Sequence, residues 1–142
     1  MALLQVNYAS KSLRKIVTFN ALIPLDTIEI PGQRKTEKKS MRAIYLLHGY
    51  TGHHTDWICG TRIQELSHKY NIAVFMPSGE NNFYLDDEDK GELFGEFIGK
   101  ELVEFTREMF PISNKREDTF IGGLSMGGYG AIRNGLKYND TF

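Results

Sequence analysis

The sequence predicts an α/β fold in which a mostly parallel β-sheet carries helices on both of its faces. The first observation is a set of short apolar runs, at residues 43–47, 72–76 and 119–122, which are typical of strands buried in a parallel sheet. The second is that a segment of helical pattern follows each run, so strands and helices alternate along the chain. With 142 residues, of which 41% are hydrophobic and 25% charged, the chain has the size and composition of one compact domain.

Two further strands are predicted at the start of the chain. Side chains alternate in a period of two over residues 4–8 and again over 16–23, and we expect these strands to be antiparallel neighbours. The next segment, 24–40, contains Pro31-Gly32 and a basic cluster, so it cannot bury an apolar face. We interpret it as a solvated loop rather than a polyanion-binding patch, because the net charge of the chain is −1.

The alternating part begins with the strand at 43–47, which ends at His48-Gly49. The elements expected after it are a loop at 49–60, a helix at 61–70, a strand at 72–76, a polar loop at 78–90, a helix at 91–110, a strand at 118–123 and a helix at 126–138. The helix at 91–110 has an apolar stripe that we expect to face the core, made of Phe94, Ile98, Leu102, Phe105 and Met109. Pro111 ends this helix.

The most informative motif is Gly-Leu-Ser-Met-Gly at residues 123–127, between the last predicted strand and the last predicted helix. A tight strand-to-helix turn strains the backbone of its central residue, and it requires neighbours without side chains, here Gly123 and Gly127. Gly128 would let the helix approach the sheet closely. Such a turn exposes the hydroxyl of Ser125 over a helix N-terminus, which favours developing negative charge. The alternatives are a glycine-rich packing turn or a phosphate loop, and the phosphate loop is disfavoured because no lysine follows the glycines.

Four motifs in this order resemble the esterase D group of α/β-hydrolases. They are Leu46-Leu47-His48-Gly49-Tyr50-Thr51-Gly52, Asp56-Trp57, Pro77-Ser78-Gly79 and Gly123-Leu124-Ser125-Met126-Gly127-Gly128. The group includes S-formylglutathione hydrolases, feruloyl esterases and bacterial tributyrin esterases. The run Phe83-Tyr84 and the helix at 95–104 are most similar to the tributyrin-esterase type, and the resemblance covers nearly the whole chain. It implies the α/β-hydrolase fold and a serine carboxylesterase that acts on short acyl esters without a cofactor or metal ion.

The resemblance also implies roles for single residues. Ser125 would be the nucleophile, and the backbone N–H groups of Met126 and Tyr50 would form the oxyanion hole. His48-Gly49 would support the loop that carries Tyr50. In this role His48 would brace the loop through a hydrogen bond and would not act as the base. Gly123, Gly127 and Gly128 would be the glycines of the turn. These roles agree with acyl transfer, in which two N–H donors stabilise the charge on the carbonyl oxygen by roughly 3 kcal/mol each.

The sequence lacks part of the machinery that a serine nucleophile needs. No histidine follows Ser125, and Asp140 is the only acid after it, whereas the fold places the acid and then the base after the serine. Because the family is nearly twice as long, we expect residues 1–142 to be the N-terminal part of a single α/β-hydrolase domain, truncated after the helix that follows Ser125. Such a chain would be inactive alone. The alternatives are a thioesterase or acyltransferase that uses the same serine, and a non-catalytic remnant or assembly module.

Other features give weaker predictions. The strand at 119–123 would be an exposed apolar edge, so we expect a homo-oligomer or another association through it. His53 and His54 could replace the missing base or bind a metal ion with Asp56, and the acidic run 86–89 could bind calcium; we interpret them as a surface loop and as solvated charge. Neither nucleic acid nor membrane is an expected partner. The single cysteine, Cys59, and the lack of a long apolar stretch favour a soluble protein of the cytoplasm.

Overall fold

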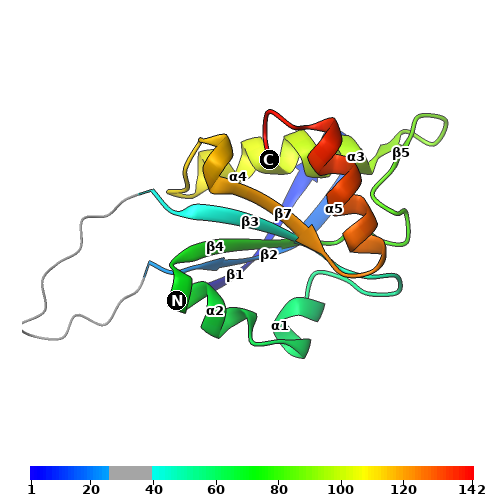
Figure 1. The fold of residues 1–142 in the computed structure, drawn as a ribbon. Helices are drawn as coiled ribbons and strands as arrows, with labels where there is room; N and C mark the ends of the chain where they lie inside the picture. The colour runs from blue at the N-terminus through cyan, green and yellow to red at the C-terminus, as the bar shows by residue number, and fades with distance from the viewer. Residues whose placement is uncertain (26–39) are drawn as a thin grey trace, which may run out of the picture.

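The computed structural model describes residues 1–25 and 40–142, and it contains a mixed sheet with helices on both faces (Figure 1). Within the described residues, five strands form this sheet in the order β1-β2-β4-β3-β7. Their bounds are Ala2–Ser10 for β1, Lys15–Ile23 for β2, Arg42–Leu47 for β3, Ile72–Pro77 for β4 and Thr119–Gly123 for β7. β3 is parallel to both β4 and β7, whereas β2 is antiparallel to β1 and to β4. The predicted fold class is confirmed.

The two faces of the sheet are covered by different parts of the chain. On one face lie α1 (Asp56–Gly60) and α2 (Ile63–Tyr70), and on the other lie α4 (Leu102–Met109) and α5 (Met126–Lys137) (Figure 1). The larger core, beneath α4 and α5, contains the buried rings of Phe19, Tyr45 and Phe75. A smaller core on the other face contains Leu22, Leu46, Val74 and Met76, with Trp57 and Ile63 packed against it. In the described part of the chain no helix has the length and apolar character needed to cross a membrane.

The N-terminal strands pair as predicted. β1 and β2 are antiparallel, with Val6 opposite Phe19 and Tyr8 opposite Val17. β2 then joins this hairpin to the parallel part of the sheet by pairing with β4. Most of the loop predicted at 24–40, including its basic cluster, falls at residues 26–39, outside the described residues.

Two predicted loops contain secondary structure that the sequence pattern did not indicate. The segment 49–60 includes the short helix α1, and the segment 78–90 includes β5 (Asp86–Asp87), which pairs with β6 (Glu92–Leu93). Residues outside the hairpin hold it in place, because Asp86 accepts a hydrogen bond from the N–H of Glu96 and another from Lys137 on α5. Contacts of this kind join distant segments, so local polarity gives no sign of them.

The predicted helix at 91–110 is correct in kind but wrong in its start. It begins at Phe94 and comprises α3 (Phe94–Glu96), a π-helical turn η1 (Phe97–Glu101) and α4. Four of the five residues of the predicted apolar stripe do face the core: Phe94, Ile98 and Leu102 are buried, and Phe105 packs against them. Met109 is the exception, because it is 51% exposed, and Thr106 is buried with its Oγ1 2.6 Å from the Tyr45 hydroxyl.

Candidate active site

Ser125 lies between the end of β7 and the start of α5, as predicted. Its backbone has φ 53° and ψ −116°, a conformation that residues with a side chain rarely adopt, and the residue is exposed. β7 is parallel to β3, with Gly123 opposite Leu47, so the serine emerges at the carboxyl end of both strands. This edge of a parallel sheet is where ligands bind in α/β proteins.

Two glycines make this turn sterically feasible. A Cβ atom on Gly123 would overlap the backbone of Gly127, and one on Gly127 would overlap the carbonyl of Leu47. Gly128 was predicted to let α5 approach the sheet closely, and that role stays a prediction. A Cβ atom on Gly128 would lie 3.4 Å from its nearest neighbour, the carbonyl oxygen of Gly123, which is an ordinary van der Waals distance. The tighter approach of α5 to the sheet is made at Gly127.

The loop after β3 packs directly against Ser125. A Cβ atom built on Gly49 would lie 3.7 Å from the Cβ of Ser125, so the Gly49–Tyr50 peptide is beside the serine. Among the described residues, the N–H groups of Tyr50 and Met126 have no hydrogen-bond acceptor. Two donors without acceptors next to an exposed hydroxyl are the groups that an oxyanion hole requires. The oxyanion role of these two groups stays a prediction.

His48 is buried, and both of its ring nitrogens make hydrogen bonds. Nε2 accepts a hydrogen bond of 2.8 Å from the N–H of Gly79, and Nδ1 lies 2.7 Å from the carbonyl oxygen of Gly49. Because a carbonyl oxygen only accepts, Nδ1 carries the proton and donates it to Gly49. The hydrogen bond that we expected His48 to make to the loop after β3 is thus present. His48 has no nitrogen left to accept a proton from Ser125.

The other histidines near this loop do not join the serine. The rings of His53 and His54 lie 4.8 Å apart, and His53 Nδ1 accepts hydrogen bonds from Thr55. Burial lowers the pKa of His54, and the neighbouring rings of His53 and His48 lower it further. Within residues 1–25 and 40–142, neither ring has a hydrogen bond or ring contact with Ser125, and no cluster of three or more His, Cys, Asp or Glu side chains is arranged to hold a metal ion.

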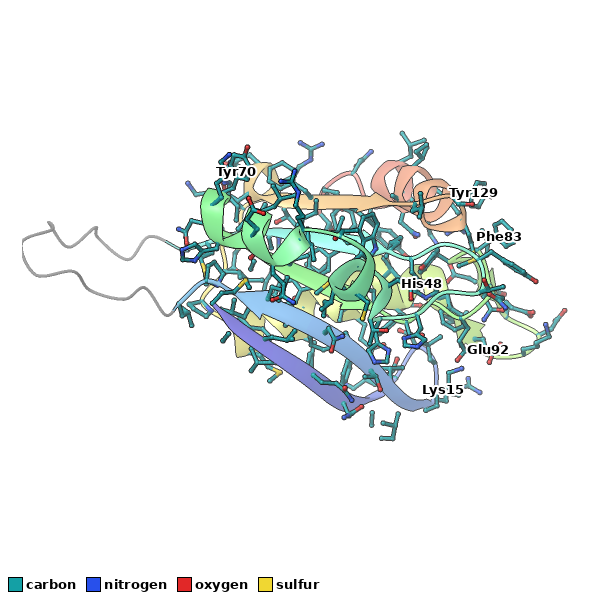
Figure 2. The ribbon with its side chains drawn as sticks, turned by 90° about the horizontal axis from the view of Figure 1, so that it is seen from below. Lys15, His48, Tyr70, Phe83, Glu92 and Tyr129 are labelled. Atoms are coloured by element: carbon teal, nitrogen blue, oxygen red, sulfur yellow. The ribbon has the colours of Figure 1, made fainter. Side chains whose placement is uncertain are left out.

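Sequence reasoning missed the residue that packs beneath this site, Tyr84. Its side chain is fully buried, and its hydroxyl donates a hydrogen bond of 3.0 Å to the carbonyl of His48. Its neighbour Phe83 is exposed instead, with ring contacts to Tyr50 and Tyr129 at about 6 Å between centroids. Figure 2 shows Phe83 and Tyr129 together at the end of the molecule where His48 lies. No spacing rule indicates this arrangement, because Phe83 and Tyr84 both have positive φ angles in a polar loop.

Comparison with known proteins agrees with this geometry. Residues 12–142 match the model of the esterase family described as "Putative esterase". The chain belongs to this esterase family. The chain is 59% identical, over all of its 142 residues, to an acetyl esterase of Caldicellulosiruptor saccharolyticus, and it covers 53% of that protein.

Two solved structures of Staphylococcus aureus proteins show the same fold. The fluorophosphonate-binding serine hydrolase F matches with a TM-score of 0.87 and 30% identity, over 99% of this esterase-family chain and 54% of that protein. An S-formylglutathione hydrolase matches with a TM-score of 0.83 and 30% identity over the same shares of the two chains. The chain therefore spans about half the length of the relatives it matches, and it has the α/β-hydrolase fold.

Proposed function

We propose that Ser125 is the nucleophile of a serine carboxylesterase that hydrolyses short acyl esters through an acyl-enzyme. The observation that carries this proposal is the backbone of Ser125, whose φ of 53° holds an exposed hydroxyl at the start of α5. Strain of this kind costs of order 1–3 kcal/mol and is concentrated at functional sites such as active sites. Membership of the esterase family and 59% identity to an acetyl esterase support the reaction class and a short acyl group.

The chemistry follows from the positions of these groups. A base removes the proton from the Ser125 hydroxyl while its oxygen bonds to the ester carbonyl carbon, and the charge that develops on the carbonyl oxygen is stabilised by the N–H groups of Tyr50 and Met126. The bond to the alcohol oxygen then breaks, and the alcohol leaves with the proton from the base. Water attacks the acyl-serine by the same route and releases the acid and the free hydroxyl of Ser125.

The general base and its acid, in this proposal, come from polypeptide outside these 142 residues. His48 supports this, because both of its ring nitrogens are engaged with Gly79 and Gly49. The relatives are about twice as long as this chain, which supports a site completed by a second half. Without that half we expect only the slow turnover that an oxyanion hole and substrate binding give, roughly 10³ to 10⁴ over water in serine proteases.

A second candidate reaction is thioester hydrolysis by the same serine. The observation that favours it is the 30% identity to an S-formylglutathione hydrolase with a TM-score of 0.83.

We also propose that the enzyme is of the tributyrin-esterase type and that it works in the cytoplasm. The exposed free thiol of Cys59 agrees with a reducing compartment.

Steady-state hydrolysis of p-nitrophenyl acetate, butyrate and octanoate, with S-acetylglutathione beside them, tests the proposal on the full-length protein. We expect kcat/KM to fall from the short to the long oxygen esters and Ser125→Ala to abolish all turnover. A preference for S-acetylglutathione would favour the thioesterase. Hydrolysis that survives Ser125→Ala would overturn the nucleophile assignment.

We further propose that the edge of β7 and the outer face of α5 associate with other polypeptide. Among the described strands β7 lies at one edge of the sheet, and exposed apolar side chains lie on β7, directly after it and on α5. They are Phe120, Leu124, Ile132 and Leu136, which are between 39% and 74% exposed. When the 142-residue chain is studied on its own, we expect a second copy of the chain to bind to this surface.

A further inference from the structure

Three hydrogen bonds join the segment 79–84 to the loop that carries Tyr50. The N–H of Gly79 donates to His48 Nε2 at 2.8 Å, and the side-chain oxygen of Asn81 accepts from the N–H of Thr51 at 2.8 Å. The third is the bond of 3.0 Å from the Tyr84 hydroxyl to the carbonyl of His48. These bonds hold the loop on both sides of Tyr50, so the segment 79–84 acts as a clamp on it.

The hydrogen bonds within the loop fix the direction of the Tyr50 N–H. This N–H belongs to the same peptide unit as the Gly49 carbonyl, which accepts hydrogen bonds from His48 Nδ1 at 2.7 Å and from the N–H of Gly52 at 3.1 Å. In a planar trans peptide the N–H points opposite to the C=O, so holding the carbonyl also aims the N–H. The Tyr84 hydroxyl holds the preceding peptide unit, that of His48 and Gly49.

Tyr84 is itself fixed by its surroundings. Its ring fills the space that a Cβ atom would need on Gly79, at the start of the segment 79–84, and on Gly130 in α5. Its backbone has φ 57°, and that of Phe83 has φ 53°, so two consecutive residues are strained. Such strain persists only where the surroundings determine the conformation. The Tyr84 hydroxyl is a donor at neutral pH, as in any tyrosine, and burial raises its pKa further.

We propose that Tyr84 is a positioning residue that aligns the Tyr50 N–H with Ser125 for the stabilisation of the oxyanion. Tyr84 touches α5 through Gly130 and the oxyanion loop through His48, so it joins the helix that starts after the nucleophile to the loop that supplies a donor. Gly79, Asn81 and His48 complete the connection. The inference rests on the proposed function, because it presumes that Ser125 and Tyr50 act on a carbonyl.

The test compares Tyr84→Phe with Tyr45→Phe, two variants that each remove one buried tyrosine hydroxyl and keep the ring. Tyr45 is the matched control, because it is also fully buried and its hydroxyl bonds Thr106, a residue outside the site. For p-nitrophenyl acetate hydrolysis by the full-length protein, we expect Tyr84→Phe to lower kcat about 10- to 100-fold with KM within about twofold. Tyr45→Phe is expected to keep kcat near the wild-type value.

A second measurement decides the inference without turnover. Nitrogen-15 relaxation reports the order parameter of the Tyr50 amide, which we expect at about 0.85 in the wild type and in Tyr45→Phe, and clearly lower in Tyr84→Phe. If wild-type protein does not hydrolyse the ester, the proposed function fails while the relaxation data still decide the positioning role. An unchanged Tyr50 order parameter in Tyr84→Phe, or a wild-type kcat for that variant in an active enzyme, would overturn the inference.

Discussion

At the scale of single residues, the strained backbone of Ser125 predicts that function and stability oppose each other at this position. Glycine adopts φ 53° without a steric cost, whereas alanine keeps the strain of order 1–3 kcal/mol. Glycine also loses roughly 0.5–1 kcal/mol more through chain entropy. We therefore expect Ser125→Gly to be about 1 kcal/mol more stable than Ser125→Ala in urea denaturation, with both variants inactive. If Ser125→Ala were instead the more stable variant by roughly 0.5–1 kcal/mol, the entropy difference alone would account for the result and the conformation would carry no strain.

The neighbouring glycines of the turn predict opposite responses to the same substitution. A Cβ atom on Gly127 would overlap the Leu47 carbonyl, a backbone atom that cannot move aside, so Gly127→Ala should destabilise the fold by about 1–3 kcal/mol or more. Gly128 has room for a Cβ atom within α5, where alanine is the better helix former by roughly 1 kcal/mol. Thermal unfolding of both variants checks the pair. A stable Gly127→Ala protein would contradict the packing described for the turn.

The sequence predicted those parts of the site that are local in the chain. The glycines at 123 and 127 follow from the demands of one turn, so their spacing is visible without a structure. The connection from Tyr84 to His48 joins residues 36 positions apart, and Gly130 makes room for a ring from another segment. Composition and periodicity contain no sign of such contacts. The sequence also does not show which of two adjacent glycines lacks room for a Cβ atom, and the structure shows that it is Gly127.

At the scale of elements, the helix at 94–109 shows how far a periodic pattern predicts structure. The apolar spacing correctly placed Phe94, Ile98, Leu102 and Phe105 in or against the core, whereas Met109 is exposed. The spacing did not indicate the π-helical turn at 97–101. The carboxylate of Glu101, in this turn, accepts hydrogen bonds from the Ser10 hydroxyl and from the N–H groups of Lys11 and Ser12, in the hairpin between β1 and β2. Because these partners lie about 90 residues away in the sequence, the helix pattern alone cannot indicate the contacts.

The small hairpin of β5 and β6 predicts a pH dependence through Asp86. Burial alone would raise the pKa of this carboxyl, but hydrogen bonds from Lys137 and the Glu96 N–H, with the charges of Lys137 and Arg133, lower it overall. A lowered folded-state pKa gives stability above the unfolded value of about 3.9, which is lost as the pH falls through the folded value. Asp86→Asn should therefore cost about 1 kcal/mol at pH 7 and progressively less below about pH 4.

Urea denaturation between pH 7 and pH 2 checks this difference. Asp89→Asn is the control, because Asp89 lies in the same hairpin but is exposed. A gap between wild type and Asp86→Asn that stays constant down to pH 2 would show that Asp86 is not held as described.

At the scale of the whole molecule, the free edge of β7 predicts self-association of the 142-residue chain. Phe120 is 39% exposed on this edge strand, and a charge on an edge strand blocks pairing with another chain. We expect sedimentation analysis to show dimers whose affinity Phe120→Lys lowers at least tenfold. Leu3→Lys places the same charge on β1, the other edge strand, and should leave the dimer intact. Monomers at every concentration would falsify the proposed association.

The architecture was predictable because each layer has a local signature. Buried strands, the antiparallel hairpin of β1 and β2 and the alternation with helices all follow from residue patterns, and the strand order is then set by pairing. The acid and base of the proposed triad cannot be derived in the same way, because the chain covers only 53% of its acetyl esterase relative. Catalysis is thus a property proposed for the whole protein, to which this chain contributes the serine and the oxyanion loop.

The most direct measurement is peptide mapping by mass spectrometry after the full-length protein reacts with a fluorophosphonate. We expect one adduct, on the peptide that contains Ser125, and no adduct in the Ser125→Ala variant. The 142-residue chain alone should react far more slowly, because the proposed base is not part of it. An adduct on another residue, or labelling that persists in Ser125→Ala, would contradict the assignment of Ser125 as the nucleophile.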